Sequence, residues 1–404
     1  MIPRLIWRNL WRNRRRTYIT MMSVMFAVML SVFFKSLQMG VWDNLIDNIV
    51  RYYSGYIQIH SEGYWNEQVI DNGFADNDSL DRLLSEASIV KSYSSRLESY
   101  ALISSDSGTR GSFIAGIDPE REAGLTGLDQ KVVKGKFLER GDQSVMMAEG
   151  AARLLKLDLN DTLIILGQGY HGAHAAGKFP ITGIVHFGSP ELNDNLVLLP
   201  LNVAQQFFNA ENIITTIAID LNKADELDEA KSELLRNVPP GYEVMTWTDM
   251  MPEIDSHIKA DNFGFYIQIG ILYLVIAFGI FGTMLMMTSE RRYEFGMLIA
   301  IGMKKYKIAL MVVGETILIS ILGAVAGMIL SLPLVQWFKV HPITFTGQYA
   351  EVLERFGFEP IYPTILKWDI FLNQGLAVLA IAVLVALFPL FIVQRVKPAT
   401  AMKR

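Results

Sequence analysis

The stretch SERRYEFGMLIAIGMKKYK, from Ser289 to Lys307, separates two of the longest apolar runs in this 404-residue chain. Apolar residues make up 51% of the sequence and gather in four windows of at least 23 residues each. At a rise of about 1.5 Å per residue, each window exceeds the roughly 30 Å hydrocarbon core of a bilayer. The sequence therefore predicts four transmembrane helices, at residues 17–39, 263–288, 308–337 and 370–393.

Basic residues beside these windows predict the orientation of the chain. Residues 1–16 carry six arginines and no acid, the connector 289–307 carries five basic residues, and the tail 394–404 carries four. Segments rich in Lys and Arg stay in the cytoplasm. We therefore expect a multi-pass inner (cytoplasmic) membrane protein with both termini and the connector in the cytoplasm. Residues 40–262 and a short loop, 338–369, are then periplasmic.

The segment 40–262 is expected to form a large external domain. It holds 34 acidic and 17 basic residues, a net charge of −17, whereas the whole chain carries −5. Such acidity disfavours nucleic-acid binding. The chain has no Cys, so neither disulfides nor thiol chemistry contributes. The predicted fold class is an α-helical membrane protein with four transmembrane helices plus a large α+β extracytoplasmic domain between the first and second spans.

This domain mixes short strands and helices, and we expect it to have two lobes. Runs of strand length and β-branched content predict strands at 56–60, 112–117, 144–148, 162–166, 180–187, 195–200, 214–221 and 242–247. Helical spacing predicts helices at 149–157, 201–208 and 223–237. A polar, helical stalk from Thr248 to Lys259, with Pro252 near its start, then leads into the second span.

The N-terminal residues 1–16 are typical of an amphipathic helix in the membrane interface. Arginines recur at helical spacing on one face, while Ile6, Trp7 and Leu10 lie on the other. Such a helix binds anionic membrane lipids. The alternative is a basic topology signal without a helix of its own.

The sequence carries no motif for catalysis, and we expect no cofactor or metal bound by this chain. A Ser/His/Asp or paired-carboxylate arrangement is not recognisable. His171 and His174 could offer two imidazoles, but no Cys, Asp or Glu lies nearby in sequence to complete a metal site.

Three residues within the third window are candidates for a polar contact or for close helix packing. Glu315 lies about eight residues inside the window, where a carboxylate needs a partner or a water-lined path. It therefore marks either a transport route or a structural hydrogen bond. Gly323 and Gly327 form a small-xxx-small pattern that permits close helix packing, within the chain or between subunits.

The connector itself predicts a short helix with one apolar stripe. Phe295, Leu298, Ile299 and Gly302 follow helical spacing, and Gly302 is suited to end the helix. We expect the stripe to be exposed, either on the membrane surface or in the groove of a partner.

The connector resembles a known family. ERRYEFGMLIAIGMKKYKI is similar to the cytoplasmic coupling segment of the FtsX-like, MacB/LolC/LolE-type ABC transporter permeases, although Ile299 stands where the family often has Arg. The blocks VKGKFLERGDQSVMMAEGAARLLKLDLNDTLIIL and FPITGIVHFGSPELNDNLVLLPLNVAQQFF resemble the family's external core, and QRVKPATAMK resembles its closing tail. The residues that match the coupling segment are Glu290, Arg291, Glu294, Gly296, Leu298, Ala300, Ile301 and Gly302.

This resemblance implies a permease dimer, homomeric or heteromeric, served by two copies of a separate cytoplasmic ATPase that binds ATP and Mg²⁺. The coupling helix would insert into that ATPase and relay its closure to the external domain. The implied coupling residues are Glu290, Arg291, Arg292, Glu294, Phe295, Gly296, Leu298, Ile299, Ala300 and Gly302.

The absence of an ATPase sequence favours the lipoprotein-releasing branch, which passes acylated proteins to a periplasmic carrier. The alternatives are a MacB-like exporter of peptides or drugs and an FtsX-like regulator of a cell-wall hydrolase. In the lipoprotein-releasing subunits a hairpin loop captures the carrier. The loop at that position here is 167–178, and its candidate docking residues are Gly167, Gln168, Tyr170, His171, His174 and Lys178.

Overall fold

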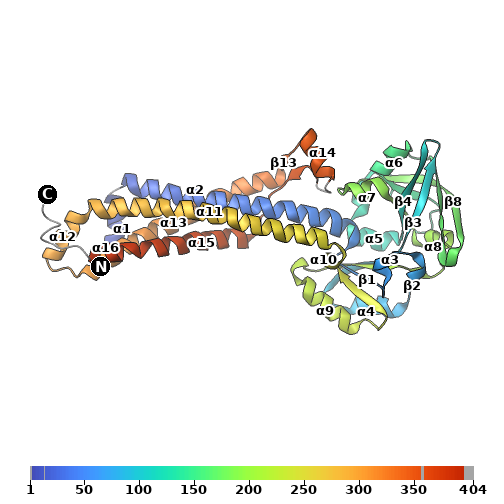
Figure 1. Ribbon diagram of the computed structural model, residues 1–404, viewed down its shortest axis with the longest axis horizontal. Coiled ribbons are helices and arrows are strands. Elements are labelled where there is room, and N and C mark those ends of the chain that lie inside the picture. Colours follow the sequence, from blue (N-terminus) through green and yellow to red (C-terminus); the bar gives the residue numbers. More distant parts are fainter. Residues whose placement is uncertain (1, 13, 356–358, 395–404) are drawn as a thin grey trace. The chain divides into compact units, whose positions relative to one another are not determined.

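The computed structural model describes residues 2–12, 14–355 and 359–394. It divides into two units, which Figure 1 draws in sequence colours. The helical unit comprises residues 1–43, 258–344 and 361–404. The mixed unit comprises residues 44–257 and 345–360. The predicted tail 394–404 lies outside the described residues except for Gln394.

Four helices of the helical unit are long and apolar enough to cross a membrane, as the sequence predicts. These candidate spans are Thr17–Ile46, Pro252–Glu290, Lys305–Val340 and Trp368–Leu390. They lie side by side in Figure 1 and share an apolar core that includes Val24, Val28, Ile280, Ala324 and Val378. The helices of the unit are α1 (Ile2–Arg12), α2 (Arg14–Ile46), α11 (Pro252–Glu290), α12 (Arg292–Ala300), α13 (Lys305–Val340), α15 (Trp368–Ala386) and α16 (Phe388–Gln394).

The fourth predicted span, 370–393, is interrupted. It forms two helices, α15 and α16, that meet at Leu387. Pro389 follows this break, and a proline has no N–H to donate to the carbonyl four residues before it. The amides of Leu387 and Leu390 instead donate to carbonyls only three residues back, at 3.3 and 3.2 Å. The local backbone therefore tightens where the sequence predicted a continuous helix.

The mixed unit is built on a ten-stranded sheet, which confirms the predicted α+β class. Its order is β12-β1-β11-β3-β4-β9-β6-β8-β5, and β7 pairs with both β3 and β8. All eight predicted strands are present. The strands of this sheet are β1 (Ile57–Ser61), β3 (Val90–Ser105), β4 (Gly108–Ile117), β5 (Val132–Gly135), β6 (Val145–Ala148), β7 (Thr162–Gln168), β8 (His174–Val185), β9 (Leu196–Pro200), β11 (Thr216–Leu221) and β12 (Tyr242–Thr246).

Two apolar cores flank this sheet. One includes Ile114, Met147 and Leu198 of the central strands, and the other includes Ile57 and Ile219 near the β12 edge. The α-helices within residues 55–251 are α3 (Tyr64–Glu67), α4 (Asp78–Glu86), α5 (Pro119–Thr126), α6 (Glu149–Leu155), α7 (Pro190–Asn195), α8 (Leu201–Phe207), α9 (Leu227–Asn237) and α10 (Trp247–Met250). Of these, α4, α6, α7, α8 and α9 contribute side chains to the two cores. An eight-residue π-helical turn, η1 (Asp47–Ser54), leads into β1. The two clusters agree with the two lobes that the element pattern indicates.

The connections near the spans differ from the prediction in two places. The stalk is divided at Met251, where α10 ends and α11 begins with Pro252. The predicted short loop 338–369 holds structure of its own: the paired strands β13 (Ile343–Thr344) and β14 (Ile361–Tyr362), with α14 (Gln348–Arg355) between them. Within the mixed unit, Glu359 accepts a hydrogen bond from the Asn44 side chain at 3.1 Å.

Candidate functional site

The connector between α11 and α13 forms one short helix, α12. Arg291, the residue that precedes α12, has a non-helical backbone conformation with φ −89° and ψ 6°. At its end, Gly302 has φ +101°. The amides of Gly302 and Met303 donate to the carbonyls of Ile299 and Leu298, at 3.0 and 2.9 Å. This pair of bonds is the Schellman motif, which favours glycine because the backbone turns left-handed. The prediction that Gly302 ends this helix is confirmed.

The apolar stripe of α12 faces the inside of the helical unit. Phe295 is only 1% exposed and packs in a cluster with Ile308 and Val312 of α13, while Leu298 and Ile299 are partly buried against the same cluster. The prediction of an exposed stripe is therefore wrong. The connector is short, so α12 folds back onto the first turns of α13 and finds its apolar partners there. Burying a phenylalanine side chain contributes about 1.5–3 kcal/mol.

A different surface of α12 remains exposed, and we call it the outward face. Tyr293 is 55% exposed, Met297 43% and Ile301 79%. These three residues recur every four positions, so they share one side of the helix. Gly296, by contrast, is buried with Phe295. Among the implied coupling residues, Glu290, Arg292, Ala300 and Gly302 are also exposed.

Charged side chains tie α12 to its neighbours. Glu294 accepts a hydrogen bond from Arg12 of α1 at 2.5 Å and one from Arg291 at 3.3 Å. Burial of Glu294 disfavours its charged form, but the two arginine bonds outweigh burial and hold the pKa of Glu294 below its ordinary value. Glu294 is therefore an anionic link between α1 and the start of α12.

Glu315 takes part in the same network. It is buried within α13, and its two oxygens accept hydrogen bonds from Arg291 at 2.6 Å and from the side chain of Asn9 at 2.7 Å. Of the two interpretations of Glu315, these contacts favour a structural hydrogen-bonding role. Asn9 and Arg12 were not identified as site residues from the sequence. Their partners are about 300 positions away, so local spacing carries no signal for them.

The predicted N-terminal helix is present as α1, and one of its faces packs on α12 and α13. Leu10 is 3% exposed, and Leu5 and Ile6 contact the cluster around Phe295. Trp7 and Trp11 remain exposed, with their rings edge to face at 5.9 Å. The interfacial location of this helix stays a prediction, while its attachment to α13 is an observed contact.

Gly323 and Gly327 of α13 pack against α2 of the same chain. A Cβ atom on Gly323 would lie 2.8 Å from the Met21 carbonyl oxygen, and one on Gly327 would lie 2.6 Å from the Met25 carbonyl oxygen. Both distances are too short for any larger residue. The contact is therefore within the chain rather than between subunits, and the glycines fix the approach of the first and third spans.

The loop 167–178 forms the tip of the β7–β8 hairpin. The backbone N–H of His171 donates to Asp71 at 2.6 Å, and that of Tyr170 donates to the Phe208 carbonyl at 2.8 Å. The rest of the tip is largely solvent-exposed, with accessible side chains at Gln168, His171, His174 and Lys178, beside the half-buried Gly167. The tip is therefore anchored by its backbone, while most of its polar side chains are exposed.

Asp71 also lies 3.9 Å from the His171 ring, which brings an acid to the loop that sequence spacing did not indicate. Among the residues that the structure describes, however, no group of three His, Asp or Glu side chains is arranged to hold a metal ion.

Comparison with known proteins finds similarities over parts of this chain. Residues 266–398 match the family described as FtsX-like permease C-terminal. The lipoprotein-releasing system transmembrane protein LolC of Xylella fastidiosa is 21% identical over 299 residues, which cover 71% of this chain and 72% of LolC. The uncharacterized ABC transporter permease MJ1507 of Methanocaldococcus jannaschii is 22% identical over 51% of each chain. The solved periplasmic region of MacB from Actinobacillus actinomycetemcomitans has a TM-score of 0.35 at 14% identity, covering 49% of this chain and 92% of that structure.

Proposed function

We infer that this chain is an ABC transporter permease of the FtsX, MacB and LolC type, because residues 266–398 carry an FtsX-like permease domain and four helices are suited to span a membrane. We propose more specifically that it releases lipoproteins from the inner membrane towards a periplasmic carrier. A separate cytoplasmic ATPase would supply the energy, with two copies serving a pair of permease chains. The similarity to LolC over 71% of this chain supports this choice of substrate.

The observation that carries the proposal is the outward face of α12. Tyr293, Met297 and Ile301 form an exposed, largely apolar surface on a helix between two spans. Helices bind in the grooves of partner proteins through apolar residues spaced three or four positions apart. We therefore assign ATPase contact to this face, in place of the stripe around Phe295 that supports the fold.

The contacts of α12 explain how such a partner would act on the spans. Phe295 fixes the helix against α13, and Arg291 joins it to Glu315 inside the same span. Glu294 joins it to α1 through Arg12. A force applied to the outward face would therefore move α1, α12 and α13 as one body. This relay needs no chemistry in the permease itself.

The membrane orientation in this proposal rests on charge. The connector is rich in Lys and Arg, and residues 40–262 are strongly acidic. The mixed unit would then lie in the periplasm, where the hairpin tip around Tyr170 and His171 is available to a carrier.

The ATPase contact can be tested by copurification of the full chain with its ATPase in mild detergent. Ile301→Asp and Met297→Asp should abolish recovery of the ATPase, because each places a charge on the proposed apolar contact. Leu235→Asp is the matched control, since Leu235 is 51% exposed on α9 of the mixed unit. Full ATPase recovery with both α12 variants would overturn the assignment.

The same preparation tests the substrate. Mass spectrometry should find an acylated protein or its soluble carrier with the wild-type chain, and Tyr170→Ala with Lys178→Ala should reduce the carrier. A peptide or drug exporter would instead yield an outer-membrane channel, and a regulator would yield a peptidoglycan hydrolase. Either of these results would contradict lipoprotein release while leaving the permease assignment intact.

A further inference from the structure

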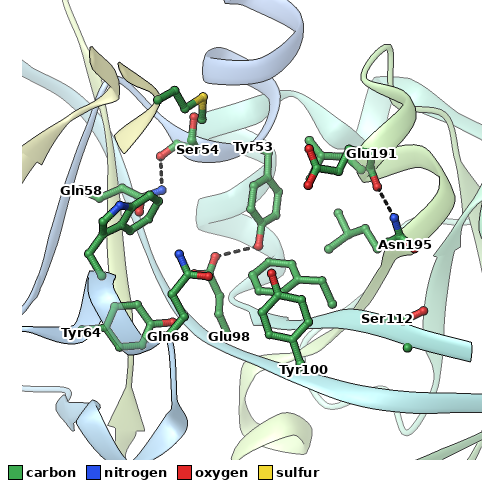
Figure 2. A pocket seen from close by; sticks show the side chains of 16 residues that line it. Tyr53, Ser54, Gln58, Tyr64, Gln68, Glu98, Tyr100, Ser112, Glu191 and Asn195 are labelled. Carbon is green, nitrogen blue, oxygen red and sulfur yellow. Dashed lines mark hydrogen bonds between the residues drawn. The ribbon is translucent and has the colours of Figure 1, made fainter. Parts of the chain in front are cut away.

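The mixed unit contains a cavity of about 460 Å³ that plays no part in the relay described above. Its walls come mainly from η1, β1, α3, β3, β4 and α7. The volume falls within the range of small-molecule sites, roughly 300–1,000 Å³. Figure 2 shows polar side chains reaching it from opposite walls, with Gln58 and Tyr64 on one side and Glu191 and Asn195 on the other.

Aromatic rings form much of the cavity wall. Tyr100 of β3 and Phe113 of β4 are cross-strand partners, and their ring centroids lie 5.0 Å apart. The Tyr53 ring stands edge to face with Phe113 at 5.9 Å. Tyr64 and Trp65 of α3 add two more rings. The faces of aromatic rings are electronegative, so a wall of this kind attracts cations more than anions.

Two carboxylates line the same cavity. Glu98 lies two residues from Tyr100 on β3, so both side chains project from one face of the strand. Glu191 lies on α7. Among the described lining residues there is no Lys, Arg or His. Burial raises the pKa of Tyr100, and the nearby carboxylates of Glu191 and Glu98 raise it further.

The charges behind the wall do not cancel. Arg96 is fully buried and donates to both oxygens of Glu122, at 2.6 and 3.1 Å. The guanidinium also lies 3.7 Å from Glu98. One buried cation thus faces two buried carboxylates, so the cluster has one negative charge in excess. The same guanidinium lies 4.5 Å from the centroid of the Tyr53 ring, so that ring already has a cation over it, and the rings left for a ligand include those of Tyr100 and Phe113.

Glu98 is also held in a fixed position. One of its oxygens accepts a hydrogen bond from the Tyr53 hydroxyl at 2.7 Å, which Figure 2 shows, and the other accepts one from Thr216 at 3.0 Å. Glu98 is therefore a positioned anion at the cavity wall.

We propose that this cavity binds an organic cation, an alkylammonium group whose charge lies near Glu98 and whose apolar part lies against Tyr100 and Phe113. The group can come from a small quaternary ammonium compound or from a lysine side chain of a polypeptide. This site goes beyond the proposed permease function, because the relay through α12 does not need it.

Isothermal titration of the full chain in detergent tests the proposal with three probes. Choline is the cation, 3,3-dimethylbutan-1-ol is its neutral isostere, and N-acetyl-lysine amide represents a polypeptide. The wild-type chain should bind choline or the lysine probe at least about tenfold more tightly than the neutral alcohol. Preference for choline identifies a small quaternary cation as the ligand, and preference for the lysine probe identifies a polypeptide.

Three variants locate the binding. Tyr100 is 62% exposed, so Tyr100→Ala should leave the fold intact. Glu191→Gln removes a charge at an exposed position. Each should weaken binding of the preferred cation roughly threefold to tenfold. Glu98→Gln should weaken it most. Glu62→Gln, an exposed position outside the cavity, is the matched control and should bind as the wild type.

Equal affinity for choline, the lysine probe and the neutral alcohol would overturn the proposal. Wild-type affinity in both Tyr100→Ala and Glu191→Gln would overturn it as well, even if Glu98→Gln fails to fold. The titration contains no ATPase, so its outcome is independent of the copurification experiment. A chain that binds the cation but recovers no ATPase contradicts the permease relay alone.

Discussion

Replacement of Arg291 by methionine should destabilise the helical unit by about 3 kcal/mol. The Arg291 and Glu315 side chains are only 13% and 3% exposed, and their charged atoms lie 2.6 Å apart. Removing one partner of a buried pair leaves the other charge uncompensated, which typically costs about 3–5 kcal/mol. The lower end applies here because Glu315 keeps its bond from Asn9 at 2.7 Å.

The assay is thermal unfolding of the purified chain in one detergent at one scan rate, since membrane proteins seldom unfold reversibly. A loss of about 3 kcal/mol lowers the melting temperature by roughly 6–12 °C in a unit of this size. Glu315→Gln alone should have a smaller effect, because Arg291 keeps Glu294 at 3.3 Å. Lys136→Met, which removes an exposed pair with Glu139, should cost under about 1 kcal/mol.

The double variant provides the decisive comparison. Arg291→Met combined with Glu315→Gln removes both charges, so it should recover about 2 kcal/mol relative to the sum of the single losses. If the two single losses simply add, the pair is not coupled and the relay between α12 and α13 loses its charged link. If Arg291→Met melts as the wild type, the buried contact itself is refuted.

Three further predictions concern packing and pH. Gly323→Ala should destabilise the helical unit by about 1–3 kcal/mol, because the added Cβ atom would clash with the backbone of α2. Gly264→Ala is the control, since a Cβ atom there has no other atom within 4 Å, and it should leave stability unchanged. Melting temperatures in detergent compare the two variants. The pKa of Glu294 is lower in the folded chain than its ordinary value near 4.3, so its charged form stabilises the fold fully at pH values above 4.3. This stabilisation is lost as the pH falls through the lower folded-state pKa. Melting temperatures measured at decreasing pH should show the loss in the wild-type chain but not in Glu294→Gln. Burial lowers the pKa of His60 to about 4, so as the pH falls the unfolded chain binds a proton at this histidine before the folded chain does. The mixed unit should therefore lose up to about 3 kcal/mol of stability between pH 6.5 and 4. Melting temperatures of His60→Asn should not show this loss.

The strands that sequence reasoning predicted are those with an apolar anchor. Each of the eight contains at least one Ile, Leu or Val that is buried in an apolar core. The 16-residue strand β3 was missed although it is central to the sheet and pairs with β4, β7 and β11. Its segment SYSSRLESY is polar, and polarity is typical of exposed loops. Arg96 can be buried because it donates hydrogen bonds to Glu122, which lies 26 positions away in the sequence. The residues next to Arg96 in the sequence do not indicate such a distant partner.

The connector shows a second limit of sequence reasoning. Helical spacing correctly predicted a short helix, its apolar stripe and its end at Gly302. Spacing defines which residues share a face, but not what covers that face. The cover comes from Ile6 and Val312, on helices that precede and follow α12 in the chain. The partner of the stripe was therefore assigned wrongly, although the stripe itself was right.

This reversal changes how a variant of α12 must be interpreted. A charge at Phe295 removes the apolar anchor of the helix and tests folding, so loss of an ATPase from that variant says nothing about contact. A charge at Ile301, which is 79% exposed, leaves the anchor in place and tests contact alone. Arg291 and Glu294 keep their partners in the Ile301 variant, so the contacts that join α12 to α13 and α1 stay intact while the proposed contact with the ATPase is removed. Only the pair of variants together separates a helix that is held in position from a helix that is bound.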